Sequence, residues 1–389
     1  MSRTPEEHAA AVRALLPPRP SSRVGVADAA RLRARLAADV RAREDQPGFD
    51  NSQMDGYAVA SLEPRLATSG PTIPAGTDPA SLYPAGLGAL AAPIMTGARL
   101  PAGTRAVVPV ERCSPAEFVA EGEQVGLPKA TAGQFCRRAG SDIREGEVLA
   151  PAGAEVTPAL YGALVAQGIE TVEVVRQARI LIITGGAEVG APGSTVGAAS
   201  VRDTNGPLLE LLAQRHGIAV AGKITTDDNP AALERAAGET VQRLAPDAVV
   251  TSGGISHGKF EVIRQVFCDG WYGHVAQQPG GPQGLSTFHG VPVLSLPGNP
   301  VSTLASFRLY VAPALGHAPE PVLVPLAAPV TGLEGREQFL RGRFDNGRAA
   351  PVGGAGSHLL AQAAPAQCLI RVPAGATLPA GDLARVYPL

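Results

Sequence analysis

The spacing of apolar residues near the start of the chain is helical. Over residues 6–16 and 26–43 they recur at steps of three and four, and Val26, Ala29 and Leu32 fall on one face of the second stretch. Pro47 and Gly48 then oppose continuation of that helix. A further helix is predicted over residues 157–167, with Pro158 at its first position.

Between these helical stretches the pattern changes to short apolar runs broken by Pro and Gly. Segments such as YAVASLEP and RAVVPVE, within residues 47–136, are typical of strands and turns. We therefore predict a small β-rich domain over residues 47–136. It is inserted into an N-terminal helical and mixed domain made of residues 1–46 plus 137–175.

From residue 178 onward, continuous apolar strands alternate with amphipathic helices. ARILIIT, IAVAGKI, DAVVTS and VPVLSL are the strands, and the segments between them have helical periodicity. This alternation predicts a parallel sheet covered on both faces, over residues 176–317. Residues 318–389 return to short strands and turns, which predicts a C-terminal β domain. The expected fold class is thus a multidomain α/β protein with a central parallel α/β domain.

Three of the predicted strands of the central domain run directly into glycine-rich turns. In an open α/β sheet such turns lie at the carboxyl ends of the strands, where ligands bind. Glycine lets the backbone approach a phosphate closely, so an anionic or nucleotide-like ligand is expected. The alternative for each turn alone is a tight connection without a ligand. The candidate binding residues are Gly185, Gly186, Ser252, Gly253, Gly254, Ser256, Pro297, Gly298, Asn299 and Pro300.

Acidic residues accompany these turns. Glu188 follows the first turn, Asp228 precedes the second, and Glu261 follows it. Carboxylates near a phosphate repel it unless a divalent cation lies between them, so the three residues are candidate ligands of Mg²⁺. The alternative is that they are solvated surface acids or helix caps.

Composition narrows the function classes. Of the 389 residues 45% are hydrophobic and 17% are charged, and the formal net charge is −2, so the chain can bury cores and lacks the basic field of a nucleic-acid-binding protein. The apolar runs are too short to span a membrane, and the first ten residues do not have the layout of a signal peptide. Four isolated cysteines without CxxC grouping argue against a zinc or iron–sulfur site and suit reduced thiols. We expect a cytoplasmic protein.

Several motifs, in order along the chain, closely resemble the molybdopterin molybdenumtransferase family, known as MoeA in bacteria and as the E domain of gephyrin. They are FDNSQMDGYAV (49–59), IMTGARLPAGTRAVVPVE (94–111), RRAGSDIREGEVLAPAG (137–153), TGGAEVG (184–190), DTN (203–205), TSGGIS (251–256), LPGNPVS (296–302) and GAGSH (354–358). The resemblance implies a four-domain subunit with a molybdopterin-binding-like central domain. It also implies a homodimer with its active site between subunits.

The same resemblance implies an activity and the residues that carry it. Molybdate is inserted into adenylylated molybdopterin, with Mg²⁺-dependent release of AMP; the molybdopterin adenylyltransferase and apo-molybdoenzymes would be partners. The implied Mg²⁺ and catalytic positions are Asp55, Thr96, Asp142, Glu188, Asp228 and Glu261. Pro297 and Pro300 match LPGNP, and Arg341 and Ser357 match positions around the oxyanion, where a guanidinium fork suits molybdate.

The chain departs from the family pattern where anions are expected to bind. The usual TGDEL reads TGGAEV, with Ala187 for an aspartate, and SGGVSxGxxD reads SGGISHGKFE, with Glu261 for an aspartate. The usual KPGKP reads QPGGP, so Gln278 and Gly281 stand where lysines are expected. Each charged hydrogen bond of a lysine contributes about 1.5–3 kcal/mol. Lys259 and Arg341 are the nearest candidates to compensate.

Two functions follow from these observations. The retained acids favour an active molybdenumtransferase, because a pure binder needs no acidic metal site. The missing lysines favour a catalytically weak paralogue that binds the pterin or a partner as a scaffold. A related pyrophosphatase or a tungstate-handling enzyme is a third possibility. His257 fits either a general base or a loop histidine bonded to backbone.

Overall fold

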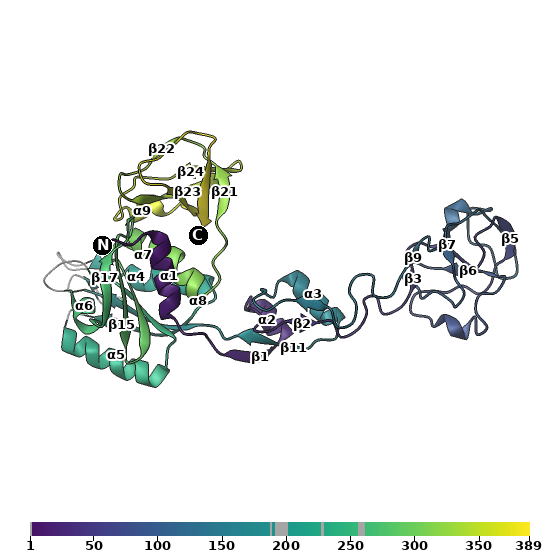
Figure 1. The fold of residues 1–389 in the computed structure, drawn as a ribbon, viewed down its shortest axis with the longest axis horizontal. Coiled ribbons are helices and arrows are strands. Elements are labelled where there is room, and N and C mark those ends of the chain that lie inside the picture. Colours follow the sequence, from purple (N-terminus) through teal and green to yellow (C-terminus); the bar gives the residue numbers. More distant parts are fainter. Residues whose placement is uncertain (1, 187–188, 191–200, 227–228, 256–260) are drawn as a thin grey trace. The chain divides into compact units, whose positions relative to one another are not determined.

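The computed structural model forms two compact units (Figure 1). It describes residues 2–186, 189–190, 201–226, 229–255 and 261–389. One unit is Ser21–Val175, which we call the N-terminal unit. The other, which we call the core unit, joins Met1–Pro20 to Arg176–Leu389.

The core unit contains the predicted α/β sheet, in the strand order β15-β12-β16-β20-β19-β17. The first four strands are parallel, as predicted, but β19 and β17 extend the sheet in antiparallel fashion. The sheet is therefore mixed rather than parallel throughout. The cause is a two-residue hairpin between β19 and β20, where His289 (φ 49°) and Gly290 (φ 80°) both have positive φ, as such tight hairpins require. The strands are β12 (Arg179–Gly185), β15 (Ala219–Thr226), β16 (Ala248–Ser252), β17 (Gly270–His274), β19 (Pro282–Phe288) and β20 (Val291–Leu296).

Helices cover both faces of this sheet, as the sequence predicts. Alternate residues of β12 enter different cores: Ile180 and Ile182 pack in one, and Leu181 and Ile183 in the other. The first core also contains Val12 of α1, so this helix packs in the core unit, although the sequence suggested the N-terminal domain for it. The helical elements of the core unit are α1 (Pro5–Leu15), α4 (Asn205–Arg215), α5 (Pro230–Leu244), α6 (Val262–Val266), α7 (Pro300–Ser306), the π-helical turn Phe307–Val311, α8 (Ala312–Leu315) and α9 (Leu360–Ala363).

A second sheet of the core unit contains the predicted C-terminal strands. Its order is β18-β23-β25-β27-β21, with β24 also paired to β23. Its first strand, β18, comes from the α/β part and pairs in parallel with β23, Gln277 opposite Glu337. The two sheets are thus joined through β18. The strands are β18 (Gln277–Gln278), β21 (Val322–Pro325), β23 (Glu337–Asp345), β24 (Arg348–Pro351), β25 (Cys368–Val372) and β27 (Leu383–Pro388); small pairs are formed by β13 (Val189–Gly190) with β14 (Val201–Arg202) and by β22 (Val330–Thr331) with β26 (Thr377–Leu378).

The N-terminal unit includes a mixed part in which one predicted helix is much shorter than expected. The helix predicted over residues 26–43 ends at Arg31, because Arg33 adopts a left-handed conformation (φ 51°) and buried Leu36 forms a β-bridge to Val174. The helix predicted over residues 157–167 is confirmed, with Thr157 as its cap. The elements are α2 (Val26–Arg31), α3 (Pro158–Ala166), β1 (Ser21–Gly25), β2 (Val40–Arg41), β10 (Val148–Ala150) and β11 (Thr171–Val175).

The remainder of the N-terminal unit is β-rich, as predicted. Tyr57, which is fully buried, is part of its core, and the Tyr57 hydroxyl accepts a hydrogen bond from the N–H of Val119 (2.8 Å). Its strands are β3 (Asn51–Ser52), β4 (Gly56–Val59), β5 (Arg65–Thr68), β6 (Ala91–Ile94), β7 (Ala106–Pro109), β8 (Gln124–Leu127) and β9 (Cys136–Arg137), with short 3₁₀ turns at Pro79–Ser81 and Val110–Arg112.

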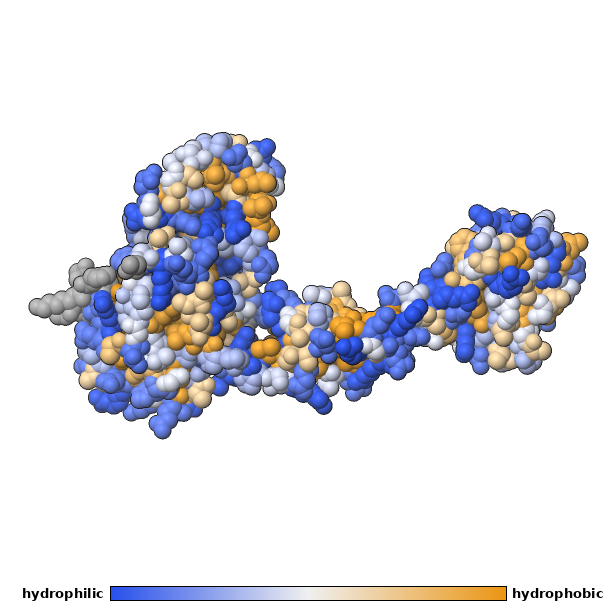
Figure 2. All heavy atoms as spheres, viewed as in Figure 1, coloured by the Kyte–Doolittle hydropathy of each residue, from blue (hydrophilic) through white to orange (hydrophobic). Residues whose placement is uncertain are grey.

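The surface is mixed in polarity (Figure 2). Apolar atoms gather over β21, where Leu323 is 64% exposed, beside Leu383 of the neighbouring strand, which is 62% exposed. Among the helices in the described ranges, none has the length and apolarity that crossing a membrane would need.

Phe267 is a test of the core on the α5 side of the α/β sheet. Its ring is fully buried and meets Phe288 edge-on, with 4.9 Å between centroids. We expect Phe267→Ala to lower the free energy of unfolding of the core unit by about 3–5 kcal/mol, because it opens a cavity that neighbours cannot fill. Leu323→Ala, at an exposed position, is the control and should change it by less than about 0.5 kcal/mol. Urea unfolding followed by circular dichroism measures both, and equal shifts would contradict this account of the core.

Candidate functional site

A cavity of about 990 Å³ lies in the core unit where the three glycine-rich turns meet. It is bounded by residues from the α/β part and from the C-terminal β part. Predicted site residues in its wall are Gly185, Gly186, Ser252, Gly253, Gly254, Glu261, Pro297, Gly298, Asn299, Pro300 and Ser357. These residues, predicted from the sequence, therefore lie together around one cavity.

Glycine residues let the backbone of these turns pack closely against neighbouring backbone. Gly185 has φ 135°, and a Cβ on it would lie 2.2 Å from the carbonyl oxygen of Thr226. A Cβ on Gly298 would lie 3.2 Å from the Cα of Gly253, which itself has φ 95°. Glycine at these positions therefore brings backbone, rather than side chains, to the cavity wall.

The third turn is held by hydrogen bonds to its carbonyl groups. The hydroxyls of Ser252 and Thr303 donate to the carbonyl oxygen of Pro297, at 3.1 and 2.8 Å. Asn299 occupies the N-cap position of α7 without a side-chain cap bond. Its Nδ2 instead donates to Oγ of Ser357 (2.9 Å), which connects the turn to the C-terminal β part.

Two carboxylates line the described part of the cavity. Glu261 was predicted from the sequence as a metal ligand. Asp203 belongs to the DTN motif but was not itself predicted as a site residue. Asp203 accepts hydrogen bonds from Thr184 Oγ1 and from the N–H of Gly206, both at 2.9 Å. Carboxylate oxygens suit Mg²⁺, which commonly takes one or two carboxylates together with substrate phosphates. The two side chains therefore offer the type of oxygen ligand that such an ion takes, although no group of three or more His, Cys, Asp or Glu that could hold a metal ion occurs within the ranges that the structure describes.

Several predicted positions lie outside the described residues. They are Glu188, Asp228 and Ser256, together with Ala187, His257 and Lys259.

Two arginines in the cavity wall were missed by the sequence reasoning. Arg202, beside Asp203, and Arg336, just before β23, are exposed and line the cavity. Within the described part of the chain, neither guanidinium makes a hydrogen bond or an ion pair. In the sequence, only their positive charge could have indicated that they line an anion-binding cavity. Two cations beside backbone turns give the cavity groups that suit an anion.

Arg341 has a different setting from the one expected. It lies on β23, is 3% exposed and is not among the residues lining the cavity. Its Nη1 donates to the carbonyl oxygen of Leu359 (2.8 Å), two residues beyond Ser357, while its buried Nη2 has no partner among the residues described. Burial lowers the pKa of Arg341. Arg341 thus stabilises the segment that contains Ser357 through a hydrogen bond to its backbone.

The N-terminal unit contains the other three predicted residues. Asp55 and Thr96 are in contact: the N–H and the hydroxyl of Thr96 both donate to Oδ1 of Asp55, at 2.6 and 2.7 Å. These two hydrogen bonds stabilise the carboxylate and lower the pKa of Asp55. Asp142 is exposed, and its N–H donates to the carbonyl oxygen of Gln46 (3.0 Å).

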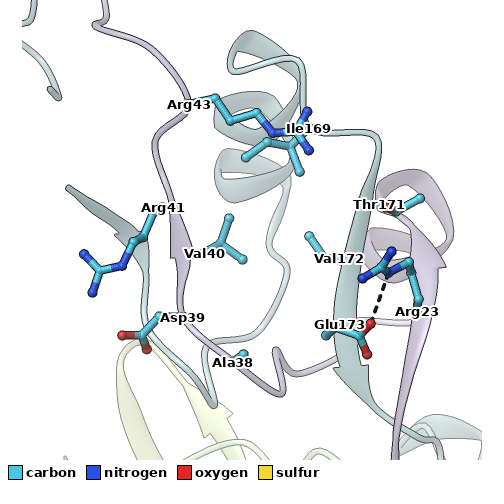
Figure 3. A pocket seen from close by; sticks show the side chains of 10 residues that line it. All are labelled: Arg23, Ala38, Asp39, Val40, Arg41, Arg43, Ile169, Thr171, Val172 and Glu173. Carbon is cyan, nitrogen blue, oxygen red and sulfur yellow. Dashed lines mark hydrogen bonds and ion pairs between the residues drawn. The ribbon is translucent and has the colours of Figure 1, made fainter. Parts of the chain in front are cut away.

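The N-terminal unit also has a smaller groove of about 300 Å³ (Figure 3). Val40 and Val172 lie at its centre, and the Arg23 guanidinium pairs with Glu173 at 3.1 Å. Arg41 and Arg43 donate to the backbone carbonyls of Gly146 and Gly168. Because these arginines already have partners, this groove is a weaker candidate for an anion than the cavity of the core unit.

Comparisons with known proteins agree along the whole chain. Residues 3–168 match the MoeA N-terminal region (domains I and II), residues 181–317 a probable molybdopterin binding domain, and residues 324–389 the MoeA C-terminal region (domain IV). Molybdopterin molybdenumtransferase 2 of Mycobacterium tuberculosis is 35% identical over 372 residues, covering 87% of this chain and 88% of the relative. Molybdopterin molybdenumtransferase 1 of the same organism is 32% identical over 423 residues, covering 95% of each chain.

A solved structure gives the same picture. The crystal structure of the molybdopterin biosynthesis MoeA protein of Pyrococcus horikoshii superposes with a TM-score of 0.75 at 26% sequence identity, covering 100% of this chain and 99% of that one.

The Asp55–Thr96 contact can be tested by titration. Thr96→Val removes one of the two hydrogen bonds that stabilise the carboxylate, so we expect the pKa of Asp55 to rise toward its ordinary value while staying below it. Carbon-13 NMR of the Asp carboxyl groups against pH measures this. Thr104→Val is the control. It removes a hydroxyl that donates a hydrogen bond to the carbonyl oxygen of Pro101, and it should leave the pKa of Asp55 unchanged. An unchanged pKa in Thr96→Val would show that the hydroxyl does not act on Asp55.

Proposed function

Because the chain belongs to the MoeA family, we propose that it is a molybdopterin molybdenumtransferase. It inserts molybdate into the dithiolene of adenylylated molybdopterin and releases AMP in molybdenum cofactor biosynthesis. The observation that carries this proposal is the cavity of the core unit, in which glycine turns, two arginines and two carboxylates surround one space.

The chemistry of the wall suits a substrate that carries a pyrophosphate and a second oxyanion. Backbone groups of the glycine turns bind phosphate oxygens, and Arg202 and Arg336 offset their charge. Asn299 and Ser357 offer neutral donors at the boundary with the C-terminal β part. The substrate is therefore held mainly by backbone and guanidinium groups.

The carboxylates of the cavity have a separate role. Asp203 and Glu261, together with Glu188 and Asp228, would hold Mg²⁺. When bound, this ion would neutralise charge on the phosphates during cleavage.

The family resemblance implies a homodimer, and in that dimer the predicted residues of the N-terminal unit have a role. Asp55, Thr96 and Asp142 would face the cavity of a second copy of the chain. Hydrogen bonds from Thr96 keep Asp55 ionised, which suits a residue acting near a metal-bound substrate. We place the protein in the cytoplasm, with the molybdopterin adenylyltransferase and apo-molybdoenzymes as its partners.

A second candidate function is a pterin-binding scaffold with little catalytic activity. The observation that favours it is segment 278–282, QPGGP, which lines the cavity without a charged side chain.

One experiment separates the two functions. The purified protein is incubated with adenylylated molybdopterin, molybdate and Mg²⁺, and AMP release is followed together with reconstitution of an apo-molybdoenzyme. The proposed function requires both signals, each dependent on molybdate and on Mg²⁺. Tight pterin binding without either signal would establish the scaffold instead, and the absence of binding would reject both.

Arg336 offers a sharper test within the same assay. Arg336→Ala should raise the KM for the anionic substrates about 10- to 100-fold, because a charged hydrogen bond contributes about 1.5–3 kcal/mol. Arg385→Ala removes another exposed arginine, from β27 and outside the cavity wall, and should leave KM within twofold. Similar values for both variants would remove Arg336 from the binding site.

A further inference from the structure

The segment that runs from β18 to the first residue of β19 forms one wall of the cavity but carries no charged side chain. It runs from Gln277 to Pro282, and each of its residues lines the cavity. Gln278 and Gly281 occupy the two positions where the family resemblance led us to expect lysines. Any contact from this wall to an anion must therefore come from neutral groups.

Two buried glutamines hold the carbonyl groups of this segment. Nε2 of Gln277 donates to the carbonyl oxygen of Pro279 (2.9 Å), and Nε2 of Gln283 donates to that of Gly280 (2.8 Å). Both side chains are 2% exposed. Gln283 also donates to Oγ of Ser306 (2.7 Å), and the Tyr310 hydroxyl donates to Oε1 of Gln277. The two carbonyls therefore point into the protein interior.

The direction of the carbonyls fixes the direction of the neighbouring N–H groups. The peptide bonds that follow Pro279 and Gly280 are trans, so the N–H of Gly280 and of Gly281 each point opposite to the preceding carbonyl. That direction leads away from the buried amides, and both glycines line the cavity. In the described part of the chain neither N–H donates to another group. Two successive free N–H groups form a concave site that favours anions.

Glycine is required at the centre of this arrangement. Gly280 has φ 91°, and a Cβ on it would lie 2.7 Å from Oγ of Ser306 and 2.9 Å from Nε2 of Gln277. The packing of the glutamine amides therefore leaves no room for a side chain at residue 280. At Gly281 a Cβ would meet its neighbours at 3.5 Å or more, an ordinary contact distance.

We propose that Gln277 and Gln283 are positioning residues that turn the N–H groups of Gly280 and Gly281 into the cavity, where they bind a tetrahedral oxyanion in place of lysine side chains. The shared chemistry is that of molybdate and of a phosphate group. The proposal rests on the proposed function and assigns the donors with which this wall binds the oxyanion. Oxyanion binding is measured without turnover, so it can fail or succeed independently of transferase activity.

Calorimetric titration of the full chain with sodium molybdate, and separately with sodium phosphate, tests the positioning role. Gln277→Met and Gln283→Met keep the side-chain length but remove the amide donor. We expect each to weaken binding of at least one oxyanion about tenfold, as expected for loss of one oriented hydrogen bond. Weakening of molybdate alone assigns the site to the metal oxyanion, and weakening of phosphate alone assigns it to a phosphate group of the substrate.

Ser306→Ala is the matched control. It removes a hydrogen bond of Gln283 but leaves the bond to the Gly280 carbonyl in place, so oxyanion affinity should stay within twofold of the native value. Thermal unfolding of all three variants reports any general loss of stability. Equal weakening in all three, unchanged affinity in both Met variants, or no binding of either oxyanion to the native protein would overturn the proposal.

A measurement on the native protein needs no variant. Uniform ¹³C and ¹⁵N labelling with triple-resonance NMR assignment gives the amide signals of Gly280 and Gly281. We expect both to shift on addition of molybdate or phosphate, whereas the amide of Gly290, in the hairpin between β19 and β20, should not move. Unmoved signals of Gly280 and Gly281 at saturating oxyanion would also overturn the proposal.

Discussion

The parallel register of β12, β16 and β20 is the constraint on which the cavity depends. Thr184 lies opposite Ser252, and Ser252 lies opposite Leu296, so the three strands end in one row. Each of these residues is followed directly by glycine or proline, in the pairs Gly-Gly, Gly-Gly and Pro-Gly. Because a shift of one residue would turn every side chain to the other face of the sheet, the same apolar packing that builds the two cores also fixes where the turns meet.

Much of this arrangement could be predicted from the sequence, because it is local. Continuous apolar strands followed by Gly-Gly or Pro-Gly indicate both the strands and the edge at which they end, and the cap at Thr157 marks the start of α3. The glycine turns were therefore identified correctly as neighbours. Their partners across the cavity were harder to find. Arg336 belongs to the C-terminal part of the chain, and nothing in its neighbourhood distinguishes it from other exposed arginines.

The predictions that were wrong depended on long-range contacts. Residues 32–43 have helical periodicity, but Leu36 is stabilised more by its bridge to Val174 and its burial than by a continued helix. The antiparallel strands β17 and β19 were missed because the His289–Gly290 hairpin signal is short. At the segment after β18, the sequence shows Gln278 and Gly281 in place of the expected lysines. It does not show that the buried amides of Gln277 and Gln283 hold the carbonyl groups of this segment, because that contact depends on the fold.

The pairing of β18 with β23 makes one wall of the cavity belong to two sheets at once. A rotation of the C-terminal sheet cannot leave the segment after β18 in place without breaking the backbone bonds opposite Glu337 and Gln338. Arg371 strengthens the same connection, since it is paired both with Glu337 on β23 and with Glu6 on α1. The C-terminal sheet is therefore connected directly to this wall of the cavity. A substitution far out on that sheet can alter the shape of the cavity without touching any residue that lines it.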